Sequence, residues 1–290
     1  MKLRIFTFVI ILMLIGLPIG GCGNSANQDI TEIQPVNQDI IEVMKILPSY
    51  TRVFWSIDLK QMRENANLNG LYQFLISKEF FDEEGLRSST GIRLSDVNTL
   101  ILTEKAGTRN HWALFKGDLN FEEIRQVFSR MFLQLDYGGV EIWRSSSTSF
   151  GFFEDMGIMC DTYEEIDVAV DCSKGEGRLM YDDEYFRTII DKLPPGIGYS
   201  LIKNEYMGGQ VGGITIYESD NKILIRGWYK FPSGNDASSY ISDIEQNLEA
   251  AFSGTDIECY QHDDFVEING EMSIEDLITS DYWKYYGFSH

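Results

Sequence analysis

Few side chains in this sequence could bind a metal ion together. The chain contains three histidines, His111, His262 and His290, and only His262 has a second candidate ligand close by, Cys259 three residues before it. A structural zinc site takes four protein ligands and a catalytic site takes three. Because one pair is too few for either, we expect no metal site and no cofactor.

Neighbouring carboxylates occur in two segments, YDDEY with Asp182 and Asp183, and HDDF with Asp263 and Asp264. Two carboxylates in one cleft can act as general acid and general base. The first pair precedes a helical pattern, however, and aspartate is a favoured helix cap. The second pair lies where a hairpin turn is expected. We therefore interpret all four as capping or turn residues.

Motifs for phosphate binding and nucleophilic catalysis are missing from the sequence. The segment KGEGRL has two glycines of the dinucleotide fingerprint, but it lacks the third glycine and the strand-to-helix setting. It indicates a turn. The sequence contains no G-x-S-x-G elbow, P-loop or calcium-binding loop. We therefore predict no catalytic residues.

Cys22 has the most specific sequence context of the four cysteines. It follows the basic residues Lys2 and Arg4, the apolar run IFTFVIILMLIGL, and then Gly20 and Gly21. This order is typical of a secretion signal. The apolar run is short against the roughly 20 residues that span a bilayer core. The segment therefore predicts export.

The stretch IGGC, residues 19–22, resembles the lipobox of bacterial lipoproteins, and the resemblance is confined to this signal region. It implies that the Cys22 thiol receives a diacylglyceryl group, that the signal peptide of residues 1–21 is removed, and that the new amino terminus is acylated. Two or more acyl chains hold a protein stably at a bilayer. The resemblance thus implies a lipid anchor in the cell membrane or outer membrane, with the protein on the extracytoplasmic face.

A polar segment follows Cys22. Residues 23–40, GNSANQDITEIQPVNQDI, contain no basic residue and repeat the tetrapeptide NQDI. Polar low-complexity sequence beside an anchor is typical of a spacer. We predict a tether over residues 22–46, and we expect a chain that begins near Asp39 to fold.

Acidic residues dominate the charged side chains. The 290 residues include 45 Asp and Glu against 24 Lys and Arg, for a net charge of -21. Such a surface repels phosphates, so we expect no nucleic-acid partner. With 43% hydrophobic residues, the chain beyond the tether is long enough for one large core or two small ones.

Alternating apolar and polar residues predict strands of antiparallel sheets. The predicted strands are RVFWSID (52–58), NTLILTE (98–104), HWALFKG (111–117), VEIWRS (140–145) and KILIRGWYKF (222–231). Apolar residues at helical spacing predict helices. The predicted helices follow Asn120, follow the segment SGND (233–236), and cover residues 68–81, 162–170 and 184–193.

Two parts of the sequence follow the same plan. Residues 100–117 align without gaps with residues 214–231, and in both parts a capped helix and a short strand, VEIW or IECY, come next. The first part has the order of a ferredoxin-like split βαβ unit, βαββαβ. We therefore predict an α+β fold with an internal duplication: a first unit over residues 47–180, with an extra hairpin at 150–160, and a second, shorter unit over residues 181–290.

The chain ends in the aromatic segment SDYWKYYGFSH. Its rings make up more apolar surface than a free terminus exposes without becoming sticky. We favour docking of this segment on the core. The alternative is a strip that contacts an envelope protein or a glycan, formed by Tyr282, Trp283, Tyr285 and Tyr286.

Four tryptophans lie within the strand patterns: Trp55, Trp112, Trp143 and Trp228. We interpret them as residues that pack within the sheets. Stacking against a glycan stays open for any of them that lies on a polar face.

Three cysteines remain once Cys22 carries lipid. If residues 162–170 form a helix, Cys172 is carried about 15 Å along it, farther from Cys160 than the roughly 7 Å between Cα atoms that a disulfide allows. We predict no Cys160–Cys172 disulfide and expect these thiols and that of Cys259 to be mostly buried as small apolar side chains.

These features together predict an extracytoplasmic, lipid-anchored, non-catalytic binding or scaffold protein. Two alternatives are kept: a transporter-linked solute-binding lipoprotein, and a hydrolase of envelope polymers that uses a carboxylate pair. A deep cleft between two domains would favour solute binding. Carboxylates that converge in a groove would favour the enzyme, and a convex body with neither would favour the scaffold.

Overall fold

The computed structural model describes residues 38–78, 80–105, 111–204, 210–253 and 255–282. Residues 1–37, which include Cys22 and most of the predicted tether, lie outside the described residues, as do Trp283, Tyr285 and Tyr286. The predictions for the signal peptide and the lipid attachment therefore rest on the sequence.

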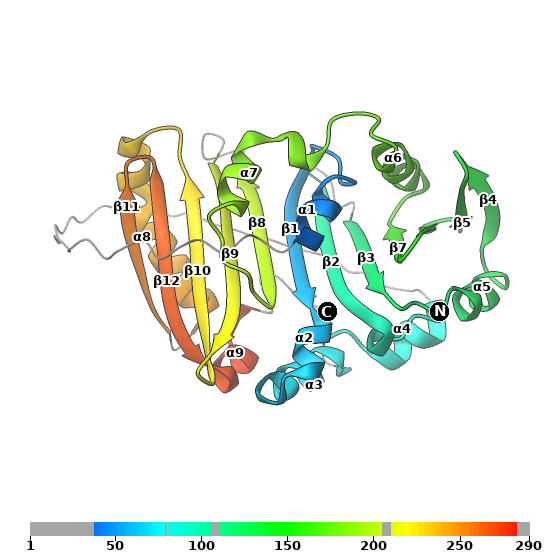
Figure 1. The fold of residues 1–290 in the computed structure, drawn as a ribbon, viewed down its shortest axis with the longest axis horizontal. Coiled ribbons are helices and arrows are strands. Elements are labelled where there is room, and N and C mark those ends of the chain that lie inside the picture. The colour runs from blue at the N-terminus through cyan, green and yellow to red at the C-terminus, as the bar shows by residue number, and fades with distance from the viewer. Residues whose placement is uncertain (1–37, 79, 106–110, 205–209, 254, 283–290) are drawn as a thin grey trace.

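One antiparallel sheet organises the described part of the chain (Figure 1). Its twelve strands follow the order β11-β12-β10-β9-β8-β1-β2-β3-β7-β6-β5-β4. In chain order they are β1 (Thr51–Asp58), β2 (Val97–Lys105), β3 (His111–Gly117), β4 (Leu133–Tyr137), β5 (Val140–Arg144), β6 (Ser149–Phe153), β7 (Met156–Cys160), β8 (Gly198–Asn204), β9 (Gln210–Ser219), β10 (Lys222–Lys230), β11 (Asp256–His262) and β12 (Phe265–Ser273). The predicted α+β class with antiparallel strands is confirmed.

Helices cover both sides of this sheet. They are α1 (Gln38–Met44), α2 (Leu59–Glu64), α3 (Asn69–Ile76), α4 (Glu83–Thr90), α5 (Phe121–Phe128), α6 (Tyr163–Ser173), α7 (Glu184–Ile190), α8 (Gly234–Ala251) and α9 (Ile274–Thr279), with short 3-10 turns η1 (Ala66–Leu68), η2 (Leu94–Asp96) and η3 (Met180–Asp182). The helices predicted after Asn120 and after the segment SGND (233–236) are confirmed as α5 and α8. Asn120 caps α5 as predicted, and α8 begins inside that segment, where the Ser233 side chain accepts a hydrogen bond from a backbone N–H.

Period-two alternation sends the strand side chains into two cores, one on each side of the sheet. Trp55 and Ile57 of β1 point into the first core, which α2 to α5, α8 and α9 cover, whereas Phe54 points into the second, under α1, α6 and α7. Both cores take residues from the N-terminal and the C-terminal part of the chain. The predicted units 47–180 and 181–290 therefore share one sheet and both cores.

The pairing of β1 with β8 joins the two parts of the chain. Val53 lies opposite Ile202, and Ile57 lies opposite Gly198, in antiparallel register. From this pair, β2 and β3 follow outward on one side and β9 and β10 on the other. The mirrored order agrees with an internal duplication, which stays a prediction.

The predicted ferredoxin-like order is not confirmed. A split βαβ unit places strands that are not consecutive side by side, but β1, β2 and β3 are neighbours in chain order, and so are β8, β9 and β10. All the strand pairs in the described residues are antiparallel. The prediction failed because alternation specifies which face of a strand is buried and says nothing about its neighbour.

The extra hairpin is also different from the predicted one. In the sheet, β7 lies beside β3 as β12 lies beside β10, so the hairpin β6–β7 occupies the place of β11–β12. The hairpin without a counterpart in the other half of the sheet is β4–β5, beyond β6, whereas the sequence predicted an extra hairpin at 150–160, which is β6–β7. The alignment of VEIW with IECY does not agree with the sheet either, because the strand in the place of β11 is β6, whereas VEIW lies in β5.

The end of the predicted tether belongs to the folded body. Residues 38–44 form α1, and its Ile40, Val43 and Met44 are buried in the second core. The prediction of a tether over 22–46 is therefore wrong from residue 38 onward. Two turns of apolar spacing after a polar repeat are too short a pattern to stand out in the sequence.

The predicted helix over 162–170 is confirmed as α6, and its cysteines are free. Cys160 ends β7, Cys172 lies in the last turn of α6, and no disulfide joins them. Both thiols are buried and that of Cys259 is half-buried. Burial raises the pKa of the Cys172 thiol to about 11 and that of Cys259 to about 12, so all three are poor nucleophiles at neutral pH.

Candidate functional site

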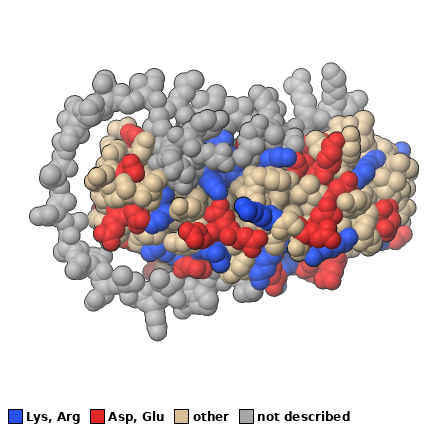
Figure 2. Space-filling model, turned by 90° about the horizontal axis from the view of Figure 1, so that it is seen from above, with Lys and Arg blue, Asp and Glu red and all other residues tan. Residues whose placement is uncertain are grey.

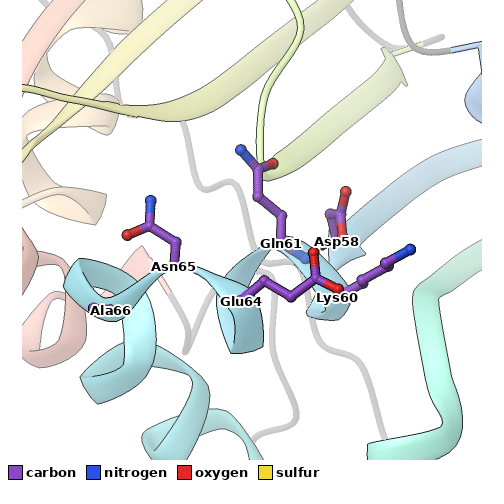
Figure 3. Close-up of a pocket in the computed structure, with 6 residues that line it drawn as sticks. All are labelled: Asp58, Lys60, Gln61, Glu64, Asn65 and Ala66. Carbon is purple, nitrogen blue, oxygen red and sulfur yellow. Dashed lines mark hydrogen bonds between the residues drawn. The ribbon is translucent and has the colours of Figure 1, made fainter.

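A shallow polar pocket lies at the end of β1, around α2 (Figure 3). It has a volume of about 570 Å³ and is lined by Asp58, Lys60, Gln61, Glu64, Asn65 and Ala66. All six residues belong to one continuous stretch of chain. The pocket is thus a feature of a single short helix and its ends.

The polar groups around this pocket hold the local backbone in place. Asp58 caps α2, since its Oδ1 accepts a hydrogen bond of 2.8 Å from the Gln61 N–H. The side-chain amides of Asn65 and Asn67 donate to the two carboxylate oxygens of Glu218, on β9. The backbone N–H of Asn221 donates to the same carboxylate and is the largest favourable cause of its lowered pKa. These contacts fasten α2 and η1 to the other half of the sheet.

The second candidate is the side of β10, β12 and β11 that faces away from α8. We call this surface the open face, because beyond α7 none of the described helices covers it (Figure 1). Its residues alternate with those that point into the first core, and their side chains are half-buried or exposed. They are Leu224, Arg226, Trp228, Lys230, Glu258, Tyr260, His262, Phe265, Glu267, Asn269 and Glu271.

Two aromatic rings near one end of the open face are covered by lysines. The Lys192 ammonium lies 4.3 Å from the centroid of the Trp228 ring and 4.6 Å from that of Phe265. The Lys230 ammonium lies 4.4 Å from the Phe265 centroid. The Trp228 and Phe265 rings meet edge to face at 6.2 Å. Such contacts stabilise a cation over a ring by about 0.5–1 kcal/mol at exposed sites.

The cations of this cluster differ in their partners. Lys230 pairs with Asp264, and His262 Nε2 lies 2.9 Å from Glu267 Oε2. Among the described residues, no carboxylate lies within ion-pair distance of Lys192. The Lys192 ammonium is therefore held by rings alone and can receive an anionic group from a partner. A sugar could stack on Trp228 only after Lys192 had moved.

Trp228 is the one of the four predicted tryptophans that reaches the open face. Trp55, Trp112 and Trp143 are buried, and each indole N–H donates to a side-chain oxygen. The alternation of Arg226, Trp228 and Lys230 in the sequence is the signal for this placement. Lys192 and Phe265 were missed, because they reach Trp228 from other elements.

Tyr282 is not a surface contact. It is 1% exposed, its ring stacks on Phe252 with centroids 4.7 Å apart, and its hydroxyl accepts a hydrogen bond from Trp55 Nε1 at 3.1 Å. The proposed contact with a partner or glycan is therefore wrong for Tyr282, which docks on the core as the favoured interpretation predicted. The other aromatic residues of the strip lie outside the described residues.

The remaining sequence candidates have structural roles. Asp183 caps α7, and Asp182 accepts from the backbone N–H of Leu179. Asp263 lies in the turn between β11 and β12 with a positive φ of 54°. Cys259 packs toward the first core and His262 lies on the open face, so the two cannot bind one metal. Within the described ranges, His, Cys, Asp and Glu side chains form no group of three that could hold a metal ion.

Surface charge is mixed in sign despite the acidic composition. On the face seen from above in Figure 2, acidic and basic side chains are interspersed. None of the helices in the described part of the chain is both long and apolar enough to span a bilayer.

Comparisons with known proteins show similarity of fold only. No protein-family model and no curated protein sequence matches the chain. Crystal form III of TP0453 superposes with a TM-score of 0.52 and 11% identity, covering 82% of this chain and 96% of that one. Crystal form IV (0.49, 11% identity) and crystal form I (0.47, 12% identity) each cover 86% of this chain and 96% of theirs. At this identity, the match to crystal form III shows that the chain shares the fold of TP0453.

Proposed function

We propose that this protein is a lipoprotein, anchored through Cys22 on the extracytoplasmic face of the cell membrane or outer membrane, and that it acts as a non-catalytic binding or scaffold protein. The lipobox-like stretch at 19–22 supports the anchor. The continuous sheet supports the binding role, because the described residues form one body with exposed faces.

The pairing of β1 with β8 is the observation that carries this proposal. A transporter-linked solute-binding protein holds its ligand between two lobes, and ligand sites in general favour such interfaces. Here the two halves form a single sheet, and the polar pocket draws all its residues from 58–66. The architecture thus favours a partner that binds a surface.

The hydrolase alternative has less support. A carboxylate pair needs two acids that point into one groove. Asp182 and Asp183 bind backbone N–H groups beside α7, and Asp263 and Asp264 lie in a turn. Asp58 lines the pocket but caps α2. Each of these acids already has a local structural role.

The predicted anchor would hold the body close to the membrane. Since α1 packs into the second core, only residues 23–37 separate it from Cys22. As a flexible coil, a segment of this length reaches roughly 20 Å. A partner on the same membrane could then reach the open face.

We infer that this partner is an envelope protein that brings a carboxylate to Lys192. The observation in favour is the ammonium held over Trp228 and Phe265 without an acidic partner among the described residues. A glycan has less support, since Lys192 covers the ring on which a sugar would stack.

Metabolic labelling with a fatty acid tests the anchor. The wild-type chain should incorporate label and lose its signal peptide, whereas Cys22→Ala should do neither. Cys259→Ala is the matched control, because that thiol lies in the body, and it should be labelled like the wild type. Unchanged labelling of Cys22→Ala would contradict the anchor.

Photo-crosslinking in intact membranes tests the binding role. A photoreactive residue at Glu258, exposed on the open face, should give a discrete adduct that weakens when Lys192→Glu is added. The same residue at Glu249, exposed on α8 at the opposite side of the sheet, should not give that adduct. Equal adducts from both positions, or none from either, would contradict the proposal.

A further inference from the structure

Exposed apolar side chains gather at one end of the sheet. Six large apolar residues are exposed in the described part of the chain. Four lie in or just before β4, Met131, Leu133, Leu135 and Tyr137, and a fifth, Tyr163, contacts Arg144, which pairs with Leu133. Leu133 is 65% exposed and Met131 is 59% exposed. Single exposed apolar residues are ordinary, but a contiguous group marks an interaction surface.

Strand β4 is also an open edge. It pairs with β5 on one side, its five residues are all exposed, and within the described residues no strand pairs with its other side (Figure 1). Edge strands normally carry charges, proline or a bulge that prevents pairing with another chain. The sequence of β4, LQLDY, has one charge and no proline.

The apolar residues of β4 lie on the side of the sheet that α6 covers. Leu135 is opposite Ile142, which is buried in the second core with residues of α6. At one end of α6 the Arg144 guanidinium lies over the Tyr163 ring, and at the other Tyr137 Oη donates to Asp171. The exposed rings and leucines therefore form a strip along the edge.

The residues of β4 are complementary to themselves in antiparallel register. When a second β4 is placed antiparallel and centred on Leu135, Leu135 faces Leu135 of the second copy and Leu133 faces Tyr137. On the other side of the sheet, Gln134 faces Asp136. The Gln134 amide donates one N–H to Glu141, and its second N–H can donate to the Asp136 carboxylate of the second copy.

We propose that β4 is the contact between two copies of this chain, which pair edge to edge about a two-fold axis. Such an interface is isologous, since the same strand serves on both sides. The backbone N–H and C=O groups of the two edges hydrogen-bond to each other, and apolar side chains meet on the α6 side. This inference does not depend on the lipid anchor.

The association should be weak and depend on concentration. Five residues a copy bury far less than the roughly 1,600 Å² of a standard interface. If the anchor exists, confinement to one membrane would raise the local concentration of copies. Monomer and dimer are then both populated, so a disulfide can trap the dimer and sedimentation can measure the equilibrium between the two.

Cysteine crosslinking of the full-length protein in the cells that express it tests the register. In a Cys259→Ser background, Leu135→Cys should form a symmetric disulfide-linked dimer, because Cα atoms of facing residues in an antiparallel pair lie about 4.5–5.5 Å apart, within the range that a disulfide allows. Leu133→Cys and Tyr137→Cys should each give little dimer alone and should crosslink when the two chains are co-expressed. Tyr185→Cys, exposed on α7, is the matched control and should give little dimer.

The outcomes separate the occupants of the edge. Dimer from Leu135→Cys and from the mixed pair supports the proposal. No dimer in either case overturns it, and so does equal dimer from Tyr185→Cys, which would indicate random collision. A Leu135→Cys adduct with a different chain overturns it in favour of strand addition by another protein. As a second measurement, sedimentation of the purified full chain should show dimerisation weakened about tenfold or more by Leu135→Lys.

Discussion

The two edges of the sheet differ in the way they meet solvent. β11 ends the sheet on one side with the acidic residues Asp256 and Glu258 and the polar residue His262, and α8 packs behind it. β4 ends it on the other side with Leu133, Leu135 and an inserted hairpin. Charge on an edge strand opposes pairing with another chain. The proposed contact between two copies would use the apolar edge and leave the acidic edge free.

The first prediction tests whether both edges belong to one cooperative body. Phe150, near β4, packs on Phe128 and Phe152, and Phe252, near β11, stacks on Tyr282. Both are fully buried, so Phe150→Ala and Phe252→Ala should each lower the free energy of unfolding by about 3–5 kcal/mol. Urea denaturation followed by fluorescence should show one transition in each variant. A separate early transition of the β4 end would contradict a single body.

The second prediction concerns the support of α6, which flanks β4. Glu165 is buried and accepts hydrogen bonds from Tyr50, Lys105 and Trp112. Glu165→Ala leaves these three donors without their acceptor, so we expect it to lower the free energy of unfolding by about 2–4 kcal/mol. The loss is limited because water can still reach the partly exposed Lys105. Glu164→Ala changes the exposed neighbour on the same helix and should have little effect. Chemical denaturation measures both, and equal effects would contradict the role of Glu165.

The third prediction concerns the dependence of stability on pH, which Asp161, next to the end of β7, should affect. Burial raises the pKa of Asp161, just after β7, to about 6. Because this pKa is above the ordinary value of about 3.9, the contribution of Asp161 to stability is full below pH 4 and is lost as the pH rises through 6. Asp161→Asn keeps an oxygen that can accept from the His111 N–H and should stabilise the protein by about 1–2 kcal/mol at pH 7.

Unfolding curves at a series of pH values check this linkage. The difference between wild type and Asp161→Asn should grow between pH 4 and pH 6 and then level off. Burial also lowers the pKa of His111, whose contribution is lost as the pH falls, so both proteins should retain a slope of the opposite sign. A difference that is constant over this range would contradict the buried carboxyl.

The fourth prediction makes the β11 edge resemble the β4 edge. Glu258→Leu combined with His262→Leu places apolar side chains on the protected strand. Both residues are exposed, so the free energy of unfolding should change by no more than about 0.5 kcal/mol. Self-association should nevertheless increase in sedimentation experiments. If the double variant associates no more than the wild type, charge is not what protects this edge.

The sequence was sufficient for the elements that depend on local pattern. Alternation identified β1, β2, β3 and β10, Asn120 marked the start of α5, and the apolar spacing after SGND identified α8. Neighbours in the sheet were not predictable, because a period of two specifies a face and not a partner. The same limit hid the Lys192–Trp228 contact, which joins a loop after α7 to β10.

Two short elements, α1 and β4, were also not predicted from the sequence. α1 has too few apolar positions to be distinguished from the polar repeat before it. β4 alternates as LQLDY before a Gly138-Gly139 turn in which both glycines have positive φ. A Gly-Gly pair after alternating residues is a signal of a hairpin, but this hairpin was not among the predicted elements. The exposed β4 edge was therefore found only in the structure.

Hydrogen exchange of the full-length protein at low and high concentration compares the two edges most directly. The backbone N–H groups on the outer side of β4 should exchange more slowly as concentration rises, because a second β4 pairs with them, while those of β11 should not change. Leu135→Lys should remove the effect at β4. Exchange at β4 that is independent of concentration, or slowed equally at both edges, would contradict the account.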